Sequence, residues 1–195
     1  MHIRIVEDKP LDSNCFTNGK SCSFGATTRI DESKIFCMYR SGTTKHSYDG
    51  KLLGQLSEDN GKNWNRPVVI CDLTRADQVE SVISGQVAAT HEKVLIATVT
   101  TVFKPQKETS QKETYLFSNE GKRQKRKQYK IQSSDYGKTW LEPEQIAVED
   151  DMVQPCFLGQ SVLMPNGELF FTFGHGSKDN FNHRTIGAYI GSPDG

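Results

Sequence analysis

Residues that could move a proton lie close together in the segment 39–50. His46 carries an imidazole, which titrates near neutral pH and can act as a general acid or base, and Asp49 offers a carboxylate three residues later. A simpler interpretation is equally consistent: Asp49 and Gly50 form a tight turn, and His46 is a solvated loop residue. Proton transfer by His46 or Asp49 is therefore one of two interpretations that the sequence leaves open.

A second segment, 175–184, is rich in side chains that donate or accept hydrogen bonds. These side chains are His175, Lys178, Asp179, Asn180, His183 and Arg184. The two histidines come without further ligands at metal-site spacing, so we predict neither a metal nor any other cofactor. The five cysteines include no C-x-x-C pair, which argues against a zinc site and a disulfide framework and favours buried free thiols.

A third group of polar residues is basic. The segment 121–127 holds five Lys or Arg residues in seven, within an expected insertion at 103–127. This insertion is either a solvated loop or a cationic lid over an acidic ligand. The whole chain has 24 Lys and Arg against 24 Asp and Glu, which gives no support to a nucleic-acid partner. No apolar run is long enough to cross a bilayer, and no signal peptide is readable at the start.

The elements that position these residues follow from a repeat. Ser57–Trp64 reads S-x-D-x-G-x-N-W and Ser133–Trp140 reads S-x-D-x-G-x-T-W, and a third copy begins at Ser192 and is cut at Gly195. In each full copy the glycine can take the positive φ of a tight turn. The aspartate can accept hydrogen bonds from the turn's own amides, and the tryptophan can pack against the neighbouring unit. The residues assigned to this structural role are Ser57, Asp59, Gly61, Trp64, Ser133, Asp135, Gly137 and Trp140.

Short strands separated by turns surround both copies of the repeat. They divide the chain into units at about 20–75, 80–150 and 155–195. The first two units hold four strands each, and only three strands fit the third, the first of them near 160–164. Almost nothing has the periodicity of a long amphipathic helix. We therefore predict an all-β chain of four-stranded antiparallel units, the pattern of β-propeller blades.

The S-x-D-x-G-x-T-W motif resembles the Asp-box, or BNR repeat, of the sialidase (neuraminidase) superfamily, over residues from about 20 to 195. The resemblance implies a six-bladed β-propeller, of which about three blades are present, so residues 1–195 are expected to form the N-terminal part of one sialidase-like propeller domain. It also implies two rims. The Asp-boxes lie on one rim, and the connections between second and third strands build the ligand site on the other.

The same resemblance suggests roles for single residues. Sialidases have an Arg at the end of the second strand, which Arg40 matches, and then the acid/base Asp, where this chain has His46 with Asp49 further on. The Arg of the family's Arg-Ile-Pro stretch, which helps to clamp the substrate carboxylate, is missing from the matching segment 21–25. The residues expected to bind substrate are Arg40, His175, His183 and Arg184.

Two functions are compatible with this pattern. The first is an exo-acting glycoside hydrolase for sialic-acid-like sugars, with this chain as its N-terminal half and inactive alone, because the family's Tyr nucleophile and its remaining arginines belong to later blades. The second is a non-catalytic propeller that binds glycans. Both expect a carbohydrate partner, an acidic sugar or glycan, no nucleic acid and no membrane insertion. The location is left open, as cytoplasmic or as associated with a phage or cell surface.

Overall fold

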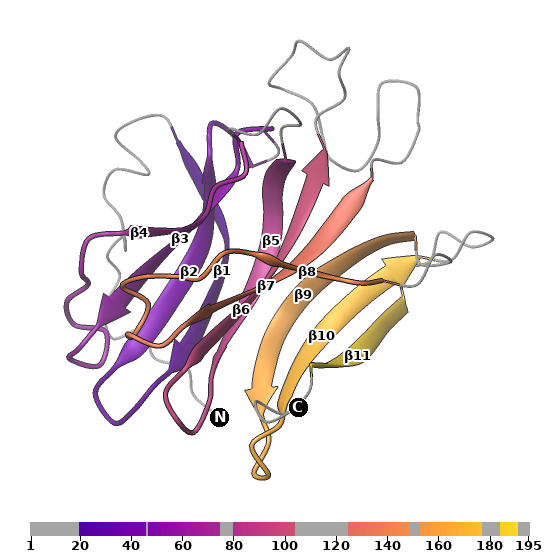
Figure 1. Cartoon of the computed structure of the whole chain (residues 1–195). Coiled ribbons are helices and arrows are strands. Elements are labelled where there is room, and N and C mark those ends of the chain that lie inside the picture. The colour runs from indigo at the N-terminus through magenta and orange to yellow at the C-terminus, as the bar shows by residue number, and fades with distance from the viewer. Residues whose placement is uncertain are drawn as a thin grey trace, which may run out of the picture.

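A computed structural model describes residues 20–45, 47–74, 80–103, 125–148, 153–176 and 184–190. Throughout these residues the chain is all-β, and its strands form three antiparallel sheets that stand next to one another (Figure 1). No helix that could cross a membrane occurs in the part of the chain that the structure describes.

Each sheet pairs its strands in chain order. The first sheet contains β1 (Ser21–Arg29), β2 (Ile35–Gly42), β3 (Lys51–Ser57) and β4 (Val68–Cys71). The second contains β5 (Glu80–Ala89), β6 (Leu95–Phe103), β7 (Arg126–Ser133) and β8 (Glu144–Ile146). The third contains β9 (Val153–Leu163), β10 (Leu169–Gly176) and β11 (Arg184–Ile190). Sequential antiparallel pairing of this kind needs only a turn or loop between neighbouring strands.

The first strands of the three sheets are neighbours in space. Strand β5 packs against both β1 and β9, so the sheets follow one another like adjacent blades (Figure 1). Side chains tie these strands together: the Thr28 hydroxyl of β1 accepts a hydrogen bond from the Ala89 backbone amide of β5 at 3.1 Å, and the Ser84 hydroxyl of β5 donates to the Phe157 carbonyl of β9 at 3.0 Å. The described strands make three such sheets and not a closed ring.

Strands β5 and β6 of the middle sheet are covered on both faces, and their sequences reflect this. Every residue of β5 is buried, and so is every residue of β6 except Phe103. A strand that is buried on both faces cannot alternate apolar with charged residues. Apart from Glu80, whose carboxylate accepts hydrogen bonds within the sheet, both strands carry uncharged side chains, many of them small or β-branched, which pack closely on a pleated surface.

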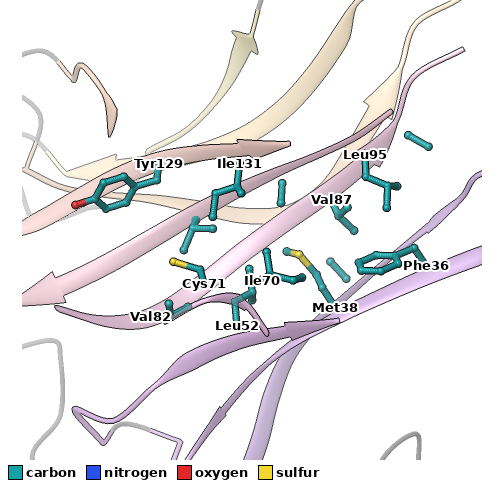
Figure 2. Close-up of a cluster of buried hydrophobic side chains, with 14 of the residues drawn as sticks. Phe36, Met38, Leu52, Ile70, Cys71, Val82, Val87, Leu95, Tyr129 and Ile131 are labelled. Atoms are coloured by element: carbon teal, nitrogen blue, oxygen red, sulfur yellow. The ribbon is translucent and has the colours of Figure 1, made fainter. Parts of the chain in front are cut away.

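The largest apolar core lies between the first and second sheets. Phe36, Met38 and Leu52 of the first sheet face Val87 and Leu95 of the second (Figure 2). Of these side chains, all but Val87 have no exposed surface. Burying a side chain of this size stabilises the fold by about 1.5–3 kcal/mol each, so this core holds the two sheets in their relative orientation.

A second core joins the second and third sheets around three phenylalanines. The Phe157 ring lies 5.1 Å from the Phe173 ring and 6.3 Å from the Phe171 ring, both in edge-on arrangements, which aromatic pairs favour. Ile96 of β6 packs against this cluster. The third sheet is therefore attached to the second as the second is to the first.

The predicted all-β architecture with four-stranded antiparallel sheets is confirmed for the first two sheets, and the third has three strands. Strand β9 begins at Val153, earlier than expected, because Cys156 and Phe157 are already buried against the second sheet.

The cysteines follow the sequence expectation in part. Cys37, Cys71 and Cys156 are buried free thiols, and burial raises the pKa of Cys37 to about 11 and that of Cys71 to about 12. Cys22 departs from the expectation, because it is disulfide-bonded.

Candidate functional site

The connections between strands separate into two rims at opposite ends of the sheets. At one end, the β1–β2 and β3–β4 connections meet: the Asn60 amide donates to the Ser33 carbonyl at 2.8 Å, and Arg29 donates to the Asn60 side chain at 2.9 Å. At the other end, the β2–β3 connection meets the start of β5, where the Val82 amide donates to the Gly50 carbonyl at 2.9 Å. We call these ends the clasp rim and the site rim.

The clasp rim carries the two repeated turns, Ser57–Trp64 (the first clasp) and Ser133–Trp140 (the second clasp). In the first clasp the Asp59 carboxylate accepts hydrogen bonds from the Asn63 amide at 2.8 Å, the Asn63 side chain at 2.6 Å and the Ser57 hydroxyl at 2.9 Å. Hydrogen bonds from Asn63 hold the pKa of Asp59 at about 2. The carboxylate therefore closes its own turn, as the sequence predicted.

The second clasp repeats this pattern. The Asp135 carboxylate accepts from the Thr139 amide at 2.9 Å, the Thr139 hydroxyl at 2.6 Å and the Ser133 hydroxyl at 2.8 Å. Desolvation raises the pKa of Asp135, but these hydrogen bonds outweigh it and bring the pKa to about 2. The hydroxyl of Ser133 also accepts from the Gly137 amide at 2.9 Å, so serine and aspartate act as one hydrogen-bonded unit.

The two tryptophans have different packing partners. Trp140 lies 5.6 Å from the Phe36 ring of the first sheet, so it packs against the neighbouring unit as predicted. Trp64 instead packs against the cluster of Cys37 and Tyr39 in its own sheet. The first sheet lies beside the second clasp, whereas none of the described sheets lies beside the first clasp in the same way.

The site rim is organised by the side chain of Arg40, at the end of β2. Arg40 has no exposed surface. Its Nε donates to the Val82 carbonyl at 2.7 Å, one terminal nitrogen donates to the Thr44 carbonyl at 2.8 Å, and the other donates to the Ser47 carbonyl at 2.6 Å. One planar fork thus joins β2, the 43–50 loop and β5, a geometry for which a guanidinium is suited.

Further hydrogen bonds attach the 43–50 loop to β5. The Ser81 hydroxyl donates to the Ser47 carbonyl at 3.1 Å and accepts from the Gly50 amide at 3.0 Å. A side chain at Gly50 would meet the Arg40 guanidinium at 2.5 Å and collide with the Val82 carbonyl. Gly50 is therefore required by the close approach of backbone to guanidinium.

Asp49, a candidate catalytic residue, lies half-buried on this loop. Its carboxylate accepts from the Thr43 amide at 3.0 Å and from the Thr43 hydroxyl at 2.6 Å. Burial raises the pKa of Asp49, but hydrogen bonds from Ser47 and Thr43 outweigh it, so the pKa lies below its ordinary value. Asp49 is therefore an ionised hydrogen-bond acceptor at neutral pH. His46 lies outside the described residues.

A second cluster on the site rim was missed by the sequence analysis. The buried Glu80 carboxylate accepts from the Tyr129 hydroxyl at 2.7 Å, the Thr101 hydroxyl at 2.9 Å and the Lys127 ammonium at 3.0 Å. Burial and the hydrogen bond to Glu80 raise the pKa of Tyr129, so the phenol stays protonated. Because its members come from three strands, β5, β6 and β7, no local spacing pattern marks this cluster.

The third sheet contributes less to the described site. In the pairing of β10 with β11, His175 lies opposite Arg184, so the backbone places these two predicted residues together at the end of the sheet where β10 finishes. His183 falls outside the described residues.

Of the basic segment 121–127, Lys125, Arg126 and Lys127 are described, and Lys127 is paired with Glu80. Among the described residues, no group of three or more His, Cys, Asp or Glu side chains is placed to hold a metal ion.

Comparison with known proteins identifies the fold. No protein-family model matches the chain, and no curated protein matches it. Solved structures do match: a Hadza microbial sialidase superposes with a TM-score of 0.69 at 14% identity, covering 86% of this chain and 35% of its own. The Trypanosoma rangeli sialidase, in complex with 2,3-difluorosialic acid, gives a TM-score of 0.53 at 14% identity and covers 88% of this chain and 30% of its own.

An enzyme of a different class shares the same architecture. An ulvan lyase from a new polysaccharide lyase family, bound to -[GlcA(1-4)Rha3S]-, gives a TM-score of 0.53 at 15% identity. The alignment covers 89% of this chain and 41% of that chain. The chain therefore has a sialidase-like fold and spans well under two thirds of the length of these proteins. At such low identity the likeness establishes the fold alone.

Proposed function

We propose that the site rim binds an acidic glycan, as part of a six-bladed, sialidase-like propeller in which the three sheets are successive blades. The observation that carries the proposal is the 43–50 loop, which Arg40 holds against β5. The loop carries an ionised acceptor, Asp49, and an exposed cation, Lys45. Sugar hydroxyls need acceptors of this kind, and an acidic substituent needs the cation.

The ligands of the structural neighbours support an acidic glycan over a neutral one. The Trypanosoma rangeli enzyme is in complex with a sialic acid derivative, and the ulvan lyase is bound to a chain that contains GlcA. Their reactions belong to different classes, so the shared property is the kind of sugar and not the chemistry. The bound ligands therefore support the binding of an acidic glycan and do not support one particular reaction.

Arg40 has a positioning role in this proposal. The resemblance to sialidases implies a contact between Arg40 and a substrate carboxylate, and such a contact would require the guanidinium to give up its hydrogen bonds to the carbonyls of Val82, Thr44 and Ser47. We therefore propose that Arg40 holds the loop while groups on the loop meet the ligand.

Glycoside hydrolysis by the full-length protein is the second candidate, favoured by the sialidase-like fold. A general acid must carry a proton at neutral pH, and glycosidases obtain one by raising the pKa of a carboxyl group. Asp49 has the opposite shift, so it is suited to act as a base or as a sugar-hydroxyl acceptor. In a hydrolytic site, the acid would have to be His46 or a group from outside the described residues.

Titration calorimetry with 3′-sialyllactose and lactose tests the proposed binding. The chain should bind 3′-sialyllactose more tightly, and Asp49→Asn should weaken binding by roughly tenfold because a charged acceptor is lost. Asp31→Asn is the matched control, because Asp31 also accepts from loop amides but lies at the clasp rim. Equal affinity for both glycans, or equal losses in both variants, would contradict the proposal. Release of 4-methylumbelliferone from its sialoside would support the second candidate.

A further inference from the structure

Phe24 has a backbone conformation that bulky residues avoid. Its φ is 57°, in the left-handed region, which is costly for a side chain with this bulk. The other described non-glycine residues with positive φ, Asn60, Lys93 and Tyr136, lie in turns or loops, whereas Phe24 lies within strand β1. The register of β1 against β2 shifts between Ser23 and Ala26, so Phe24 sits in a β-bulge. Bulges re-aim side chains and occur often beside functional sites.

The bulge turns the Phe24 ring outwards near the site rim. The side chain is 38% exposed, although β1 packs against β5. Ser23 is the backbone pairing partner of Arg40 in the β1–β2 register. Phe24 therefore follows directly after the residue that lies opposite Arg40. The conformational cost of the bulge is thus associated with an exposed aromatic ring at the end of the sheet where the site rim lies.

A cation from the 43–50 loop lies over this ring. The Lys45 ammonium is 5.2 Å from the centre of the Phe24 ring, within the range of a cation–π contact. Lys127 makes a similar contact with Phe103 at 4.8 Å, but Lys127 is also paired with Glu80 at 3.0 Å. No ion pair joins Lys45 to a carboxylate of the described residues. Lys45 therefore has a positive charge available to an incoming anion.

We propose that Phe24 and Lys45 form a subsite for one acidic pyranose unit, in which the ring stacks on the sugar and the ammonium binds its carboxylate or sulfate group. The inference rests on the proposed function and names the residues that recognise the sugar. One face of a pyranose consists of C–H groups, whose partial positive charges match the negative face of an aromatic ring. When the anion arrives, the flexible Lys45 side chain exchanges its contact with the ring for a charge-assisted hydrogen bond.

The strained backbone of Phe24 has a reason in this arrangement. A residue with ordinary strand geometry would direct its side chain to one face of the sheet, whereas the bulge holds the ring at the edge of the sheet, under Lys45. Neither residue type alone is unusual on a surface. Their contact, the positive φ of Phe24 and the site-rim position together indicate a binding surface.

Variants that separate stacking from charge test the subsite, with calorimetric titration of the full chain by 3′-sialyllactose and lactose. Phe24→Gly removes the ring and suits the positive φ, so the fold should be retained, which the melting temperature checks. It should weaken binding of both glycans by a similar factor, about fivefold or more. Lys45→Gln should weaken only the binding of 3′-sialyllactose, by roughly tenfold. Phe24→Trp and Lys45→Arg should preserve affinity.

Matched controls lie on the clasp rim. Leu141→Gly removes an exposed apolar side chain, and Lys138→Gln removes an exposed charge, both away from the site rim; neither should change affinity. If the wild-type chain binds 3′-sialyllactose and Phe24→Gly binds it equally well, the subsite is wrong while the proposed function stands. Equal losses for both glycans in Lys45→Gln also overturn it. If the wild-type chain binds neither glycan, the proposed function and the subsite are both overturned.

Discussion

Replacing Arg40 with methionine tests whether a buried guanidinium holds the site rim together. Methionine has similar length and no hydrogen-bond donor. The change removes the three hydrogen bonds from the guanidinium to the carbonyls of Val82, Thr44 and Ser47, which measure 2.6–2.8 Å, although the Ser81 hydroxyl still donates to the Ser47 carbonyl. Each buried hydrogen bond lost from a charged donor costs about 1.5–3 kcal/mol. Because Thr44 lies at the surface and can bind water instead, we expect a total loss of about 3–5 kcal/mol.

The same protein supplies a matched control in Arg29. Its guanidinium also has three acceptors: the Asp31 carbonyl at 3.3 Å, the Glu32 carbonyl at 2.8 Å and the Asn60 side chain at 2.9 Å. Arg29 differs in being exposed on the clasp rim, where water replaces lost bonds. Arg29→Met should therefore cost only about 0.5 kcal/mol.

Urea unfolding, followed by tryptophan fluorescence, measures both free energies on the same scale. For a chain of this size a loss of 1 kcal/mol lowers the melting temperature by about 2–4 °C, so Arg40→Met should melt about 6–20 °C lower and Arg29→Met within about 2 °C of the wild type. Arg40→Lys should fall between wild type and Arg40→Met, because one ammonium cannot reach carbonyls in three directions. If Arg40→Met is no more destabilising than Arg29→Met, burial does not set the role of Arg40.

Two further predictions concern the clasps. Gly61→Ala and Gly137→Ala both place a side chain at a positive φ, 86° and 83° respectively, which costs about 1–2 kcal/mol in each variant. Only the new Cβ at position 137 collides with the Phe36 ring. At position 61 the nearest atom to the new Cβ, on Trp64, is 3.7 Å away. Gly137→Ala should therefore lower the free energy of unfolding by about 1–3 kcal/mol more, and equal losses in urea unfolding would show that the second clasp does not pack tightly against the first sheet. Asp59 and Asp135 have folded-state pKa values of about 2, below the ordinary value near 3.9, so the stability that they contribute is complete above about pH 4 and is lost as the pH falls towards 2. Asp59→Asn combined with Asp135→Asn should flatten the decline of the melting temperature over that range, and an unchanged decline would mean that other carboxylates cause it.

The sequence alone was sufficient for the clasps, because their chemistry is local. Asp59 and Asp135 bond to residues within the same turn, and such contacts depend on spacing rather than on distant neighbours. The same holds for the all-β architecture and for the separation of Arg40 and Asp49 from the tryptophans. In an antiparallel sheet, alternate connections must lie at opposite ends.

Only the tertiary structure decided what the site-rim residues do. The sequence placed Arg40 at the end of a strand, but its burial depends on the Val82 carbonyl from the next sheet. The Glu80 cluster likewise unites side chains from β5, β6 and β7, and Phe24 meets Lys45 across the β1–β2 bulge. Desolvation and long-range hydrogen bonds arise from neighbours that the packing of sheets supplies. Residue types and spacing therefore suggested where a site could lie, while packing determined which groups stay buried and which remain available to a ligand.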